Sequence, residues 1–66
     1  MITLTEQLAE ARRELALRRR LYPDFIKRGT LDMTTAHYQL QAQQAIVHTL
    51  ERLEVEQRQL SLFGTS

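Results

Sequence analysis

Hydrophobic residues in the second half of the chain recur at alternating spacings of four and three residues. One such stripe consists of Ile46, Leu50, Leu53 and Leu60, with the polar Gln57 at the stripe position between the last two. This spacing places side chains on one face of an α-helix, and Leu40 and Val47 lie beside that face and widen it. No glycine or proline interrupts the pattern between Asp32 and Gly64. We therefore predict a long helix over about residues 32–60.

A similar stripe in the first half predicts another helix, ahead of the long one. Its members are Leu4, Leu8, Ala11, Leu15, Arg18 and Tyr22. Thr3 and Glu6 have the spacing of a capping box, in which each side chain accepts from the backbone N–H of the other residue. Pro23 lacks an N–H and its ring clashes with the preceding turn, so we expect this helix to kink or stop near Tyr22. The first helix is thus expected over about residues 4–22.

The sequence predicts a short turn over residues 23–29 between the two helices. Gly29 fits the left-handed backbone position that ends a helical turn. Asp32 or Thr30 is placed to cap the first N–H groups of the long helix. The fold class is therefore all-α: a helical hairpin over residues 1–58, with a kinked first helix and a long second helix.

A chain of 66 residues without cysteine is short for a stable single domain. It has no disulfide or thiolate metal site to compensate for a small core, so we expect it to self-associate. Two hairpins would pair as a homodimer in a four-helix bundle. The residues that we assign to the core or the dimer interface are Leu4, Leu8, Ala11, Leu15, Tyr22, Leu40, Ile46, Val47, Leu50 and Leu53.

Charge is distributed unevenly along the chain, although the formal net charge is only +1. Residues 1–31 contain seven Arg and Lys against four acids, about +3, and residues 32–66 contain two against four, about −2. Opposite signs suit helices that pack side by side. Acidic residues interleave with the basic cluster around Arg18–Arg20, so we interpret the cluster as a solvated, salt-bridged face. We therefore do not expect nucleic-acid binding.

The sequence offers no recognisable site for a metal, a cofactor or catalysis. His37 and His48 lie about three helical turns apart, which is too far to share one metal ion. There is no glycine-rich loop, no cysteine nucleophile and no cluster of carboxylates opposite a base. We therefore expect a protein that is not an enzyme. A signal-peptide pattern and an apolar run of membrane-spanning length are both missing, which predicts a soluble, cytoplasmic protein.

The segment Gln59-Leu60-Ser61-Leu62-Phe63 resembles the short motif that binds the bacterial replication sliding clamp. Polymerases, mismatch-repair proteins and clamp-loader components use the pattern Gln, Leu, Ser or Asp, Leu, Phe, and this segment matches it at every position. The resemblance implies that Gln59 hydrogen-bonds at the edge of the clamp's pocket and that Leu60 packs at its entrance. Leu62 and Phe63 would insert into the pocket, with Ser61 as a polar spacer. We therefore assign residues 59–66 to a clamp-binding tail.

A looser resemblance covers more of the chain. The run from Glu14 to Arg20, followed by Tyr22-Pro23, Gly29 and Leu31, is similar to small helical proteins encoded by bacteriophages and prophages. This resemblance implies an accessory protein in a host bacterial cell, which inhibits or redirects host replication when it binds the clamp.

Three alternatives stay open from the sequence. The pentapeptide is also an apolar stretch that would clasp Ile2 or Leu4 of a partner. The helical faces would also suit an inhibitor that binds another host protein, such as a transcription regulator. The arginines would also suit a small DNA-binding regulator, whose binding would weaken steeply with salt.

Overall fold

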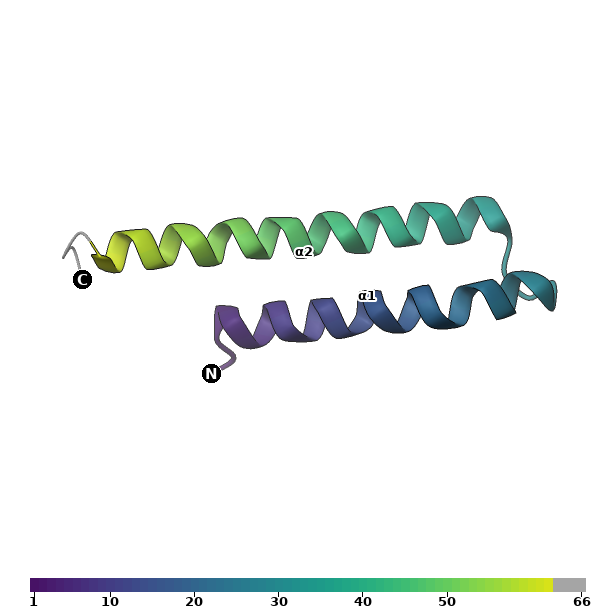
Figure 1. Ribbon diagram of the computed structural model, residues 1–66, viewed down its shortest axis with the longest axis horizontal. Coiled ribbons are helices and arrows are strands. Elements are labelled where there is room, and N and C mark those ends of the chain that lie inside the picture. The colour runs from purple at the N-terminus through teal and green to yellow at the C-terminus, as the bar shows by residue number, and fades with distance from the viewer. Residues whose placement is uncertain (63–66) are drawn as a thin grey trace.

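The structure, a computed structural model, describes residues 1–62 and consists there of two antiparallel helices (Figure 1). Helix α1 spans Leu4–Lys27 and helix α2 spans Met33–Leu62. The pair is elongated, with extents of 53 × 20 × 15 Å. The predicted all-α hairpin is therefore confirmed, and α2 is the longer arm.

α1 begins with the capping box that the sequence predicts. The backbone N–H of Glu6 donates to Thr3 Oγ1 at 3.0 Å, and the backbone N–H of Thr3 donates to Glu6 Oε1 at 2.9 Å. The hydrogen bond from the Thr3 backbone lowers the pKa of the Glu6 carboxyl, because it favours the ionised form. Two N–H groups that a helix start leaves without helical partners are thus satisfied locally.

A kink or a stop was expected near Tyr22; the stop is wrong, because α1 continues through Pro23 to Lys27. Proline at this position removes the hydrogen bond to the carbonyl of Arg19. Both residues are exposed, so water can satisfy that carbonyl. The turn after the proline also gains packing, because Phe25 is half-buried and its ring centroid lies 6.3 Å from that of Tyr22.

The connection between the helices consists of residues 28–32, in place of the expected turn over residues 23–29. Gly29 has the predicted left-handed backbone, with φ of 76°, and its N–H donates back to the last turn of α1 at 3.0 Å. The N–H of Thr30 donates to the carbonyl of Phe25, also at 3.0 Å. These two bonds form a Schellman motif, which ends α1 and turns the chain toward α2.

Asp32, one of the two residues predicted to cap the long helix, does so. Its Oδ2 accepts from the backbone N–H and from the hydroxyl of Thr35, both at 2.9 Å. The backbone hydrogen bond is the main cause that lowers the pKa of the Asp32 carboxyl. Thr30, the other candidate, instead donates its hydroxyl to the Phe25 carbonyl at 3.1 Å and so belongs to the end of α1.

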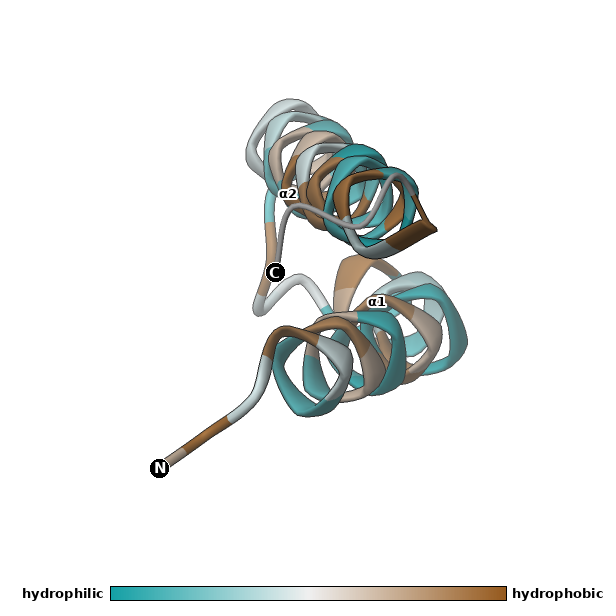
Figure 2. Cartoon of the chain, turned by 90° about the vertical axis from the view of Figure 1, so that its left-hand side faces the viewer, coloured by the Kyte–Doolittle hydropathy of each residue, from teal (hydrophilic) through white to brown (hydrophobic). Residues whose placement is uncertain are grey.

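The two helices meet along a narrow seam. Its buried residues are Leu8, Ala11 and Leu15 of α1 and Ala36, Gln43 and Val47 of α2. Leu40 and Leu50 pack against them and are half-buried, as are Leu4 and Tyr22. A view along the pair shows hydrophobic residues on more than one side of α2 (Figure 2). The seam therefore uses only part of the apolar surface of this helix.

The stripe from Ile46 to Leu60 is not the face of α2 that packs on α1, except at Leu50, which belongs to both stripes. Ile46 is 49% exposed and Leu53 is 40% exposed. Small side chains explain the choice, since Ala36 on α2 and Ala11 on α1 let the helices approach closely. The sequence-assigned core therefore divides into a buried seam and an exposed stripe beside it.

Candidate partner-binding sites

The C-terminal part of α2 extends past the start of α1, as Figure 1 shows. Near the open end of the hairpin, the hydroxyl of Thr5 donates to Glu54 Oε2 at 2.8 Å. Since α1 begins at Leu4, residues 55–62 of α2 have no opposing helix. At 1.5 Å per helical residue this overhang is about 12 Å long. Within the hairpin, the longer second helix therefore projects beyond the first.

Four residues of the clamp-like motif, 59–62, form the end of this overhang as the last turn of α2, and Phe63 lies outside the described residues. All four are exposed, with Leu60 at 62% and Leu62 at 83%. Residues two positions apart on a helix differ by about 200° in direction, so Leu60 and Leu62 point to different sides. In an extended chain the same two side chains lie on one side. The motif must therefore unwind from α2 before both leucines can contact a single pocket.

Unwinding is favoured by the composition of this helix end. The last carbonyls of any helix lack partners within the helix. The last turn of α2, as far as Leu62, contains no basic residue that would complement the negative end of the helix dipole. An ion pair of 3.3 Å between Arg58 and Glu54 lies just before the motif. Local opening of residues 59–62 would therefore leave that ion pair and the seam intact.

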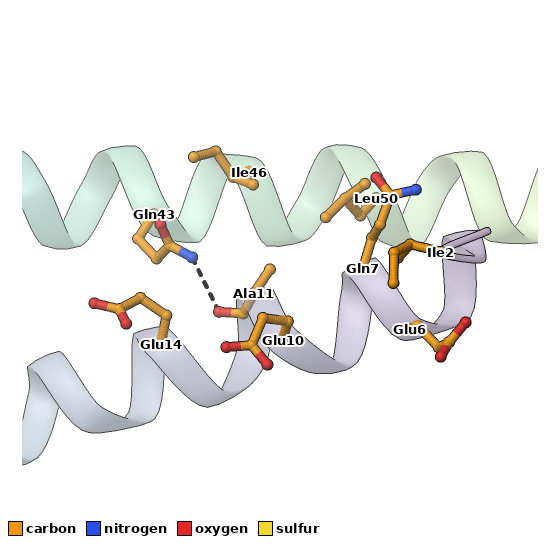
Figure 3. Close-up of a pocket in the computed structure, with 9 residues that line it drawn as sticks. All are labelled: Ile2, Glu6, Gln7, Glu10, Ala11, Glu14, Gln43, Ile46 and Leu50. Carbon is orange, nitrogen blue, oxygen red and sulfur yellow. Dashed lines mark hydrogen bonds between the residues drawn. The ribbon is translucent and has the colours of Figure 1, made fainter.

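A second candidate site is an open groove of 690 Å³ on one side of the hairpin (Figure 3). Its lining includes Ala11, Gln43 and Leu50 of the seam. Gln43 is buried and donates from Nε2 to the carbonyl oxygen of Ala11 at 3.0 Å. Ile46 of α2 and Ile2, which precedes α1, add apolar surface. Gln43 was not among the residues predicted for the core, although the helical spacing of positions 36, 40, 43, 47 and 50 places it on the seam.

Acidic residues of α1 line the other side of this groove, and each is already bonded within its own helix. Glu6 belongs to the capping box. Glu10 pairs with Arg13, whose hydrogen bond lowers the pKa of the Glu10 carboxyl. Glu14 Oε2 accepts a hydrogen bond from Arg18 Nε at 2.8 Å. The rim is therefore acidic, but its carboxylates already have partners.

Part of the basic cluster contributes to the hairpin itself. Arg12 Nη2 donates to Glu51 Oε2 across the two helices at 2.8 Å. Arg18 donates to Glu14 and also, at 3.3 Å, to the carbonyl oxygen of Gln39 on α2. These contacts agree with the predicted salt-bridged face. Because the pairs are at least partly exposed, each contributes little to stability, about 0–1 kcal/mol.

Within residues 1–62 there is no group of three or more His, Cys, Asp or Glu residues that could hold a metal ion. His37 and His48 are both exposed. Over the same residues, neither helix has the combination of length and hydropathy that would let it cross a membrane.

Comparison with known proteins adds no relative: no protein family, no curated protein and no solved structure matches this chain.

Proposed function

We propose that the protein is a non-enzymatic, phage-type accessory protein that binds the host replication sliding clamp through residues 59–63. The observation that carries the proposal is the clamp-like pentapeptide, whose residues 59–62 are exposed on the part of α2 that extends past the start of α1. An apolar anchor that is already exposed needs no rearrangement of the seam to reach a pocket. Binding then costs the ordering of a short segment and the loss of about one helical turn.

In this proposal the last turn of α2 unwinds and enters the clamp's pocket as an extended peptide. Gln59 hydrogen-bonds at the pocket edge and fixes the register. Leu62 and Phe63 fill the apolar pocket and supply most of the affinity, as buried anchors do in other interfaces. Because clamp-dependent proteins compete for this pocket, the protein inhibits or redirects host replication.

The direct test is calorimetry with purified sliding clamp and three proteins: the parent, Leu62→Ala with Phe63→Ala, and Val55→Ala. Val55 is a suitable control because it is 46% exposed, lies on the same overhang and is outside the motif. We expect the double variant to bind at least about 30-fold more weakly than the parent, the loss typical of one strong anchor. Val55→Ala should bind like the parent, and circular dichroism should show equal helicity for all three.

A parent protein that does not bind the clamp would refute the proposal, and so would a double variant that binds as tightly as the parent. A peptide of residues 57–66 should bind too, since the motif acts in its unwound form. Primer extension by a clamp-dependent polymerase separates the two modes of action. A competitor lowers extension in proportion to its occupancy of the clamp, whereas a recruiter needs a further host protein.

A further inference from the structure

The side of the hairpin that carries the groove keeps an apolar stripe that the seam does not use. Ile46 lines the groove and Leu53 follows it by seven residues, two helical turns, so both lie on the same side of α2. Leu50 and Ile2 extend this surface across the groove toward α1. We call these four residues the groove face. Ile46, Leu53 and Ile2 are 49%, 40% and 65% exposed.

The surface area of the chain indicates how much of it a partner should cover. A folded monomer of 7.8 kDa is expected to expose about 4,400 Å². The whole chain exposes 5412 Å², which is about 1,000 Å² more. A stable protein–protein interface buries about 800 Å² on each partner. The excess is therefore of the size that one further copy of the chain would remove.

We propose that the groove face binds a second copy of this chain, which gives a two-fold dimer built as a four-helix bundle. The charges around the groove favour a second copy of this chain, and not a basic peptide, as the occupant of the groove. The lining of the groove contains no basic residue, and its acids Glu6, Glu10 and Glu14 are already bonded within α1. Each of these carboxylates therefore already has a hydrogen-bond partner, an arginine for Glu10 and Glu14 and the capping residue Thr3 for Glu6, and the rest of the groove offers apolar surface. A second groove face, with the same composition, matches it.

The positions of the acids also decide the orientation of the two copies. Next to the groove, α2 presents an uncharged stripe of Ala42, Ile46, Thr49 and Leu53, whereas α1 presents the acids. A two-fold axis perpendicular to the helices would place α1 against α1 and bring like charges together. An axis parallel to the helices places each α1 against the uncharged stripe of the other copy's α2. All neighbouring helices are then antiparallel, and both overhangs emerge at the same end of the dimer.

Sedimentation equilibrium tests the face, with a matched pair of substitutions. Ile46 and Val55 are 49% and 46% exposed in the hairpin, but only Ile46 lines the groove. We expect the parent to be a dimer at micromolar concentration. Ile46→Glu should weaken it at least about 100-fold, since the charge enters the interface twice, and Val55→Glu should leave it unchanged. A parent that is a helical monomer at 100 micromolar, or an Ile46→Glu protein that dimerises like the parent, would overturn the proposal.

The orientation of the two copies is tested by measuring the distance between spin labels. Because the chain contains no cysteine, Lys27→Cys provides a single labelling site at the closed end of the hairpin. With the axis parallel to the helices, the two labels lie across the bundle, roughly 20–30 Å apart. With a perpendicular axis they lie at opposite ends, at least about 36 Å apart, the length of α1. The longer distance would refute the proposed arrangement. Neither experiment uses the clamp, so failure here leaves the proposed function untouched.

Discussion

Gln43 places a polar side chain in the apolar seam, and we expect its replacement by leucine to stabilise the hairpin. The side chain is 8% exposed and donates one hydrogen bond, to the carbonyl oxygen of Ala11. That carbonyl lies inside α1 and, as in any helix interior, accepts the N–H four residues further on. Losing Gln43 therefore leaves no backbone acceptor without a partner.

The expected size of the effect follows from two opposing contributions. A hydrogen bond of this kind contributes about 0.5–1.5 kcal/mol net. Burying a leucine side chain contributes about 1.5–3 kcal/mol, part of which the methylene groups of glutamine already supply. Gln43→Leu should therefore gain roughly 0.5–1.5 kcal/mol, whereas Gln43→Ala loses both the bond and the packing and should cost roughly 1–3 kcal/mol. The two substitutions are expected to have opposite signs.

Thermal and urea unfolding followed by circular dichroism measure both effects. For a chain of this size, 1 kcal/mol corresponds to a shift in Tm of about 4–8 °C. All variants should be compared at one protein concentration, because self-association makes Tm concentration-dependent. If Gln43→Leu lowers the free energy of unfolding by more than about 1 kcal/mol, the hydrogen bond outweighs the packing and the reasoning fails. A polar group in a helix interface can also fix the register, and Gln43→Leu tests that role through any change in oligomeric state.

Three further predictions concern the core and the helix ends. Leu8 is 2% exposed, so Leu8→Ala should lower the free energy of unfolding by about 2–3 kcal/mol. This is the lower part of the usual range, because neighbouring side chains in an open hairpin can close the gap. An unchanged urea midpoint would contradict the assigned seam. Gly29→Ala should cost about 1 kcal/mol because of the left-handed backbone alone, since a Cβ there meets nothing within 4 Å. Gly29→Asn should cost less, because asparagine tolerates this conformation better. Equal costs would refute the conformational explanation. The pKa of Asp32 is lowered in the folded state, because the ionised carboxylate is the better cap. The stability that this cap contributes is therefore complete above the unfolded-state pKa of about 3.9, and it is lost as the pH falls through the folded-state pKa. Asp32→Asn keeps an effective cap, so a pH titration of helicity should show a smaller loss in acid than the parent, and identical curves would exclude this role.

The sequence by itself determined the features that depend on residues close along the chain. The capping box of Thr3 and Glu6, the left-handed Gly29 and the cap of Asp32 all follow from bonds that span at most a few residues. Their chemistry is complete once the local sequence is given, and so is the helical periodicity. The clamp-like motif is equally a property of the sequence, although its role remains a prediction.

Tertiary structure decided the features that depend on the other helix. The seven-residue spacing of α2 supports two neighbouring stripes that share Leu50, and periodicity alone does not choose between them. The choice of the stripe through Ala36, Gln43 and Val47 depends on close approach to α1 and on the bond to Ala11. Packing also outweighed the local penalty of a proline, since α1 continues through it to complete the closed end.

The exposure of the motif was decided in the same way. Whether residues 59–62 lie beside α1 or beyond it depends on the register of the two helices. The hydrogen bond from Thr5 to Glu54 is one contact that shows this register. That bond joins residues 49 positions apart, so no local pattern encodes it. The side-chain volumes and paired charges of both helices together set the register, and the overhang, the groove and its apolar stripe follow from it.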